Sequence, residues 1–244
     1  MKKKFLVRLA TLPVLARAFM VSTLAVTAVP AALAANITWS TGPTFNGPNG
    51  HLGILTNGTL VESVNMVGLS VLPPPLTVDP LGLSITFTSI NSPFFGASWG
   101  AATGGGNSDP NWAAILTSFE WSSGGNVTAA DFLRGLTVGH QYQVQFFAAR
   151  GDCCGSRVAS FSDGIGAPSI PVSDDSYTSI VGSFVADTGA QTIRFIDSSS
   201  NPILNAYVLR DLTPAVPEPE TYAMLLGGLG LLGFVARLRK QQAA

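Results

Sequence analysis

The chain has 244 residues, of which 46% are hydrophobic and only 11% are charged, with a formal net charge of −1 at pH 7. All four Lys lie outside residues 35–214, and this central part carries five Arg against twelve Asp and Glu, a formal charge of −7. Because affinity for phosphate comes mainly from Lys and Arg, this composition argues against nucleic acid and anionic lipid as partners of the central part.

The first 34 residues have the pattern of a secretory signal peptide. A cationic start, Met1–Lys4, precedes a mostly apolar stretch at Ala18–Val29. Small residues follow at Ala32 and Ala34, which are the −3 and −1 positions of a signal peptidase site. We therefore expect export by the secretion machinery and cleavage after Ala34, with a retained N-terminal anchor as the alternative.

The central part shows no helical period sustained over three turns. Short runs of β-branched and aromatic residues alternate instead with turn formers, a pattern typical of strands. In the clearest alternation, Tyr142, Val144 and Phe146 are expected to face inward. Gln143 and Gln145 are expected to face solvent. The predicted strands are Ile37–Ser40, Leu60–Val67, Leu83–Ile90, Ile115–Trp121, Gln141–Ala149, Arg157–Ser162, Ser179–Val185, Thr192–Asp197 and Leu204–Leu212.

These strands predict an all-β fold over residues 35–214, an antiparallel β-sandwich of the jelly-roll type. Two segments are predicted loops, the proline-rich Leu72–Leu76 and the glycine-rich Gly104–Pro110. Asp131–Leu136 has the composition of a short helix, and the following Thr137–His140 is predicted to be a turn.

Candidate aromatic binding residues flank the glycine-rich loop. Trp99 and Trp112 could be exposed there and stack on the rings of a glycan, although core packing is the preferred interpretation for each of them. Trp39 and Trp121 lie in predicted strands and are expected to be core residues.

Nothing in the sequence forms a convincing catalytic set. Glu62 and Glu120 could pair across strands, yet their spacing does not favour this over two independent carboxylates. Ser98 lies in a Gly-x-Ser-x-Gly pattern, but a glycine run follows where a nucleophile elbow needs a helix. We therefore expect no enzymatic activity.

Metal and cofactor sites are not indicated. His51 and His140 have no metal-ligand spacing, so no metal ligand and no cofactor is assigned. The oxygens of Asp174–Asp175 and Asn107–Asp109 could supply a structural calcium site, although neither segment follows a known calcium loop.

Cys153 and Cys154 are adjacent and are the only cysteines. In an exported protein they could form a vicinal disulfide, which would be strained, or intermolecular cross-links, or remain free thiols. The preceding Arg150–Asp152 reads Arg-Gly-Asp, a tripeptide used in cell adhesion; a simple turn is the better interpretation.

Near the end of the sequence, Thr221–Ala236 is an uncharged run of 16 residues, about 24 Å of helix. It is expected to form a transmembrane helix, with a buried C-terminal helix as the alternative. Arg237, Arg239 and Lys240 follow it as a basic membrane stop.

With Pro217, Glu218 and Pro219 before it, this region, residues 215–244, resembles the PEP-CTERM sorting signal of Gram-negative bacteria. The resemblance implies that an exosortase, a membrane-embedded cysteine protease-transpeptidase, recognises the tripeptide and removes the tail. It also implies an inner-membrane-anchored precursor and a final place in the envelope or outside the cell.

A second resemblance covers most of the central part. Ile37–Trp39, Gly135–Tyr142 and Ile203–Arg210 look like the single jelly-roll ectodomains of surface proteins with this tail. Together the two resemblances imply an exported structural protein of the surface or extracellular matrix, associated with biofilm or exopolysaccharide. The alternative is a polysaccharide-binding module that uses the aromatic loop.

Overall fold

The computed structural model describes residues 36–68, 72–99, 106–150, 157–199, 201–214 and 224–232. Several predicted features lie outside these ranges: the signal peptide with Ala32 and Ala34, the pair Cys153 and Cys154, the tripeptide Pro217, Glu218 and Pro219, and the basic residues Arg237, Arg239 and Lys240.

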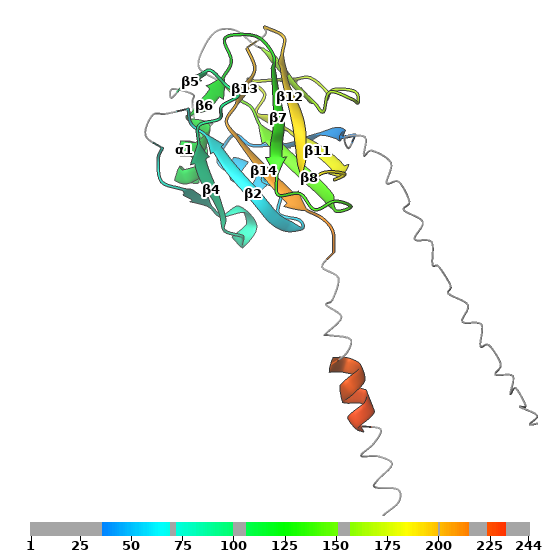
Figure 1. Cartoon of the computed structure of the whole chain (residues 1–244). Helices are drawn as coiled ribbons and strands as arrows, with labels where there is room; N and C mark the ends of the chain where they lie inside the picture. Colours follow the sequence, from blue (N-terminus) through cyan, green and yellow to red (C-terminus); the bar gives the residue numbers. More distant parts are fainter. Residues whose placement is uncertain are drawn as a thin grey trace, which may run out of the picture. The chain divides into compact units, whose positions relative to one another are not determined.

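Within the described residues the strands form three sheets (Figure 1). The large sheet has seven strands in the order β1 (Thr38–Thr44), β11 (Thr178–Val185), β8 (Gln141–Phe147), β14 (Ala206–Asp211), β2 (Thr59–Met66), β4 (Ile85–Ile90) and β3 (Leu76–Val78). The second sheet contains β10 (Val172–Ser173), β9 (Val158–Ser162), β12 (Ala190–Asp197) and β7 (Val127–Arg134). The third contains β13 (Ile203–Leu204), β6 (Phe119–Trp121) and β5 (Ala97–Trp99).

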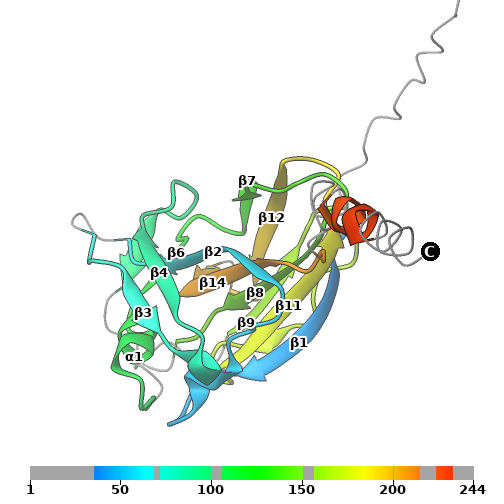
Figure 2. The ribbon, with the colours of Figure 1, turned by 90° about the horizontal axis from the view of Figure 1, so that it is seen from below.

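The helices between the described strands are short. They are α1 (Pro110–Leu116) and the 3-10 turns η1 (Gly50–Gly53) and η2 (Pro80–Gly82). Figure 2 shows β7 and β12 on one side of the large sheet and α1 close to β3.

Two hydrophobic clusters occupy the two faces of the large sheet. Neighbouring residues of β8 show this directly, because successive side chains of a strand point to opposite faces. Phe146 packs into the cluster shared with the second sheet, where it stacks on Phe161 at a centroid distance of 4.6 Å. Phe147 packs into the cluster under α1, with its ring 4.9 Å from that of Trp112.

The prediction of a β-rich fold is confirmed, but the purely antiparallel arrangement is wrong. β2 and β4 pair in parallel, with Val64 opposite Thr88 and Met66 opposite Ile90. A jelly roll has eight strands in two antiparallel sheets. The mixed seven-stranded sheet departs from that arrangement, because the long connection through β3 brings β4 back alongside β2 in the same direction.

The predicted strand Ile115–Trp121 begins in a helix instead. The Asp109 carboxylate accepts hydrogen bonds from the backbone N–H groups of Asn111 and Trp112, both at 2.9 Å, and Pro110 occupies the first helical turn. An Asp at the N-cap followed by Pro is a helix-start signal. Only Phe119–Trp121 of the predicted strand belongs to β6.

The segment expected to be a short helix, Asp131–Leu136, lies mostly in β7. Opposite Thr192 of β12, β7 carries extra residues, because Gln191 pairs with Leu133 while Ile193 pairs with Ala129. This bulge interrupts the alternation of buried and exposed residues in β7. The two-residue period that predicts a strand is therefore absent from this part of the sequence.

Gln145 does not face solvent, although the alternation predicted that it would. Its side chain is 1% exposed, and its Nε2 donates to the Gly53 carbonyl and to Ser179 Oγ, both at 2.9 Å. Its Oε1 accepts from the Leu55 N–H at 2.9 Å. The segment around η1 therefore covers this face of β8 and satisfies a buried amide.

Of the predicted transmembrane run 221–236, the structure describes a helix over residues 224–232. Among the described residues, no helix combines the length and hydropathy needed to cross a membrane.

Candidate functional site

An open hollow of about 180 Å³ lies where the large sheet faces β7. We call it the edge cleft, because β7 is the outermost strand of the second sheet. The large sheet contributes Glu62 and Tyr207, and the loop after β4 contributes Ser92, Pro93 and Phe94. The facing strand β7 contributes Asp131, Phe132 and Arg134.

A second hollow of about 360 Å³ lies next to the edge cleft and shares Glu62 and Ile90 with it. This second hollow lies over Leu60–Val64 of β2 and over Thr86, Thr88 and Ile90 of β4. The parallel pairing of the two strands extends over only three residue pairs, and Ser63 Oγ then donates to the Thr86 carbonyl at 2.7 Å. Backbone and side-chain oxygens therefore line a groove between strands of one sheet.

The bulge of β7 sets the direction of the charged side chains on the facing wall. Asp131 has a φ of 52°, a left-handed conformation that is uncommon for a residue with a side chain. It is exposed, as is Arg134, whereas Phe132 and Leu133 between them are buried. The Arg134 Nε donates to the Asp131 carbonyl at 2.8 Å, which ties the guanidinium to the bulge.

Opposite this wall, Glu62 is half-buried and its Oε1 accepts a hydrogen bond from the Tyr207 hydroxyl at 2.7 Å. Burial raises the pKa of Glu62, while the Tyr207 hydrogen bond and the positive charge of Arg134 act in the opposite direction. Burial and the neighbouring Glu62 also raise the pKa of Tyr207. The tyrosine therefore stays a hydrogen-bond donor to the carboxylate.

Aromatic rings form the apolar part of the edge cleft. The ring of Phe132 lies 5.1 Å from that of Tyr207 and 6.1 Å from that of Phe94. Tyr207 and Phe132 are buried, while Phe94 is only partly buried against the core. Of these three aromatic side chains, Phe94 is therefore the one that keeps an accessible surface.

Glu120 supports the loop that carries Phe94. Its Oε1 accepts from the Ser92 N–H at 2.6 Å, and Ser92 Oγ in turn accepts from the Phe94 N–H at 3.2 Å. The side chain is 1% exposed. Burial raises the pKa of Glu120 to about 7, although the backbone N–H groups of Ser92 and Gly68 oppose the shift.

Trp112, one of the two tryptophans considered for glycan stacking, is 0% exposed. Its ring packs under the large sheet against Phe87 and Phe147, and its Nε1 donates to the Phe45 carbonyl at 3.1 Å. Trp112 is therefore a core residue, as the preferred interpretation had it, because α1 turns the side chain inward, and the stacking hypothesis is wrong for this residue. Trp99 ends strand β5, and its side chain is outside the described part of the structure.

The candidate carboxylates Glu62 and Glu120 have different hydrogen-bond partners. Glu62 bonds Tyr207 of the large sheet, and Glu120 bonds the loop at Ser92. Ser98 lies within β5 with Glu120 as its register partner on β6, so its backbone belongs to a strand and not to a tight strand-to-helix turn.

The oxygens of Asn107 and Asp109, which were considered for calcium, already have protein partners. The Asp109 carboxylate caps α1, and Asn107 Oδ1 accepts from the Asp109 N–H at 2.9 Å and lies 3.0 Å from His51 Nδ1. Across the ranges that the structure describes, no three His, Cys, Asp or Glu side chains group in a way that could hold a metal ion. The side-chain oxygens of Asn107 and Asp109 therefore serve local hydrogen bonds, and a calcium site at Asp174–Asp175 stays a prediction.

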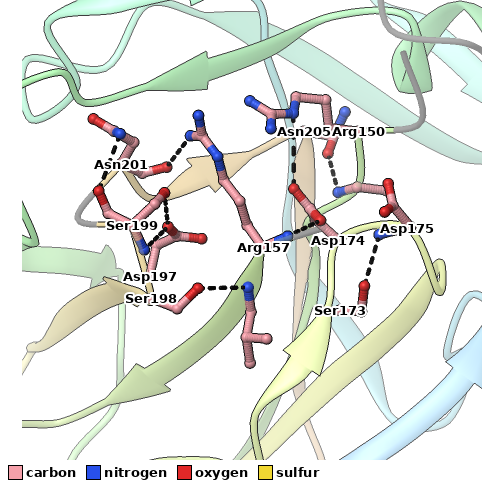
Figure 3. A network of polar contacts seen from close by, with 12 residues as sticks. Arg150, Arg157, Ser173, Asp174, Asp175, Asp197, Ser198, Ser199, Asn201 and Asn205 are labelled. Atoms are coloured by element: carbon pink, nitrogen blue, oxygen red, sulfur yellow. Dashed lines mark hydrogen bonds and ion pairs between the residues drawn. The ribbon is translucent and has the colours of Figure 1, made fainter. Parts of the chain in front are cut away.

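Figure 3 shows where Asp174 and Arg150 lie. Arg150 is 5% exposed and its Nε is 3.7 Å from Asp174 Oδ2, while Asp174 Oδ1 accepts from the Arg157 N–H at 3.0 Å. Burial raises the pKa of Asp174. An adhesion tripeptide needs an accessible Arg, so the buried Arg150 argues against an adhesion role, while Gly151 and Asp152 lie outside the described residues.

The sequence did not predict the edge cleft, because the segments that form its walls are separated by tens of residues. Two local signals were present: Glu62 interrupts an apolar run, and Asp131 and Arg134 bracket a pair of buried hydrophobic residues. Neither signal indicates that the two segments face one another.

Comparisons with known proteins identify the C-terminal region. Residues 215–240 match the family model of the PEP-CTERM protein-sorting motif. No curated protein matches the chain. Among solved structures, the chain is similar to the ANX2 ectodomain from Arabidopsis thaliana, with a TM-score of 0.44 and 10% identity over 71% of this chain. The match spans 57% of that ectodomain. The chain thus carries a PEP-CTERM sorting motif, which implies an exported protein that an exosortase processes and that is associated with the membrane or cell surface.

Proposed function

We propose that this protein is a structural component of the cell envelope or extracellular matrix, delivered as a membrane-anchored precursor and released from its anchor by an exosortase. The observation that carries the proposal is the order of three elements within residues 215–240: a Pro-Glu-Pro tripeptide, an uncharged span and a basic cluster.

The order has a physical rationale. Pro217 and Pro219 fix their own φ angles and disfavour a helical conformation of the preceding residues. The tripeptide would therefore stay extended next to a span that inserts into the membrane. Arg237, Arg239 and Lys240 would hold the far end on the cytoplasmic side. An extended peptide beside an anchor is an accessible substrate for a membrane-embedded protease.

The composition of the body supports a structural role outside the cell. Residues 35–214 contain no Lys and have a formal charge of −7, so their polar surface consists mainly of uncharged groups. Such a surface can hydrate and contact neutral exopolysaccharide without binding nucleic acid or anionic lipid. We propose that the body acts as a building block and catalyses no reaction.

Mass spectrometry of the protein from cells with and without the exosortase tests this proposal. We expect the mature chain from normal cells to begin after Ala34 and to lack Arg237–Lys240. Cells without the enzyme should accumulate a heavier chain in the membrane fraction.

Paired variants sharpen the test. The double change Pro217→Ala and Pro219→Ala should block removal of the tail, because both restrained residues are lost. Pro214→Ala, which lies just outside the matched residues, is the control and should be processed normally. A mature chain that keeps Arg239 and Lys240 in normal cells, or a double variant that is processed like the control, would contradict the proposal.

A further inference from the structure

We propose that the edge cleft is a binding site for a neutral, hydroxyl-rich glycan, with Glu62, Asp131 and Arg134 as the polar contacts and Phe94 as the stacking surface. This inference rests on the geometry of the described residues and on the charge of residues 35–214, and it does not depend on how the C-terminal tail is processed.

The polar side chains offer both kinds of hydrogen bond that a sugar hydroxyl can make. Asp131 and Arg134 are exposed on the wall formed by β7, and Glu62 lies on the opposite wall. Ionised carboxylates only accept hydrogen bonds, and a guanidinium only donates them. A hydroxyl group is both donor and acceptor, so a ligand with several hydroxyls can satisfy both walls with charge-assisted hydrogen bonds.

The side chains on the two walls are held in place before any ligand binds. The Tyr207 hydroxyl fixes Glu62 at 2.7 Å, and the Asp131 carbonyl fixes the Arg134 Nε at 2.8 Å. The left-handed backbone of Asp131 and the bulge around it direct the side chains of Asp131 and Arg134 toward the edge cleft. Bulges and strained residues of this kind are common at binding sites, where they redirect side chains.

The apolar surface and the dimensions also suit a glycan chain. Phe94 presents a partly exposed ring that backs onto Phe132, which fits the apolar face of a sugar ring. The edge cleft of about 180 Å³ adjoins a second hollow of about 360 Å³ that shares Glu62 and Ile90 with it and is also lined by Thr86 and Thr88. A linear polymer bound in the edge cleft could therefore extend toward further hydroxyl groups on the large sheet.

Charge selects the class of glycan. Two carboxylates and one guanidinium line the edge cleft, and the whole body is acidic. A polymer of uronate residues would be repelled by Glu62 and Asp131, whereas a neutral polymer would not. We therefore infer a neutral polysaccharide as the occupant.

The test uses the full chain purified in detergent, with affinity electrophoresis through gels that contain dextran, galactomannan or alginate. A neutral polymer, dextran or galactomannan, should retard the protein, and alginate should not. Arg134→Gln and Phe94→Ala should each weaken binding at least tenfold. Asp131→Asn should weaken it as well while preserving the left-handed backbone, which Asn tolerates.

Arg194→Gln is the matched control, since Arg194 is an exposed residue of β12 that does not line the edge cleft. Cooperative unfolding of each variant verifies that it is folded, and Asp131→Asn, which changes no shape, carries the test if Phe94→Ala is unfolded. Binding to neither dextran nor galactomannan, binding to alginate alone, or equal binding by the control and Arg134→Gln would overturn the inference. Failure of tail processing would leave it unaffected.

Discussion

In the part of the chain that the structure describes, the edge strands β3 and β7 both lie near aromatic residues, but one is covered by a helix and the other is not. At one edge, β3 is in contact with α1, and Trp112 of that helix is fully buried against the large sheet. At the other, β7 ends the second sheet with no further strand paired to it among the described residues, and it carries the bulge around Asp131.

The difference shows how a protein can use an edge strand in two ways. A bare edge strand invites pairing with other chains, and a covering helix or a bulge prevents this. The helix α1 closes the first edge and turns Trp112 into core. The bulge of β7 protects the second edge without covering it, which leaves Asp131 and Arg134 accessible. An aromatic residue beside a loop is therefore a weak indicator of a binding site unless the covering elements are known.

The largest effect is expected at the covered edge. Trp112→Ala should lower the free energy of unfolding by about 3–5 kcal/mol, because it removes a large buried side chain and leaves a cavity. Phe94→Ala, at the open edge, should cost only about 1 kcal/mol, because the ring is partly exposed. Urea unfolding of the two variants measures both values. Equal losses would break the distinction between a closed and an open edge.

Glu120, which supports the loop of the edge cleft, should make stability depend on pH. Burial raises the pKa of Glu120 from its usual 4.5 to about 7, so the unfolded state releases its proton first. Stability should therefore fall as the pH rises from about 4.5 to 8, by up to about 3 kcal/mol.

The variant Glu120→Gln isolates this contribution, since Gln can still accept the Ser92 hydrogen bond and does not titrate. The difference between wild type and variant in unfolding free energy, followed from pH 4 to 8, should show the fall. A difference that stays flat over that range would mean that the buried carboxyl ionises at its usual pKa.

The left-handed backbone of Asp131 predicts a smaller effect on stability. The order of stability of the glycine and alanine variants should be opposite at Asp131 and at Asp79. With φ at 52°, Asp131→Gly should be more stable than Asp131→Ala by about 0.5–1 kcal/mol, because glycine adopts this conformation without steric cost. At Asp79, with φ at −119°, the glycine variant should be the less stable of the two. Thermal unfolding of all four variants checks this, and the same order at both positions would refute backbone strain at Asp131.

The smallest effect is expected at a hydrogen bond between two partly exposed side chains, those of His140 and Asp211. His140 Nδ1 lies 2.7 Å from Asp211 Oδ2. Burial alone would raise the pKa of Asp211, but hydrogen bonds from His140 and Thr213 outweigh it and lower the pKa. The hydrogen bond of ionised Asp211 therefore stabilises the fold at pH values above its usual pKa of 3.8. This stabilisation is lost as the pH falls through the lowered pKa of Asp211 in the folded protein.

Asp211→Asn should cost less than about 1 kcal/mol at pH 7, because the pair is close to solvent. Denaturant unfolding at pH 7 and at pH 3 measures the difference from wild type, which should shrink at the lower pH. A loss as large as that of Trp112→Ala would show that this pair is part of the core.

Much of the β structure could be predicted from the sequence, because alternation with period two is a local property. The pattern around Tyr142 and Val144 predicts β8, and both side chains are buried as expected. Strand β7 escaped the same reasoning because its bulge removes the period. Helix α1 carried a readable signal in Asp109 and Pro110, which was outweighed by the β-branched and aromatic residues that follow.

The sequence by itself determined the C-terminal sorting motif, because an enzyme that reads a contiguous segment needs only the order of residues within it. It also determined that the body is acidic and β-rich. Only the tertiary structure decided that Trp112 is covered and that Glu62, Phe94 and Arg134 meet in one cleft. The burial of a side chain and the meeting of distant side chains in one cleft depend on which strands pack together. That packing is decided by the whole chain, because every sheet and helix must bury its apolar face in a common core.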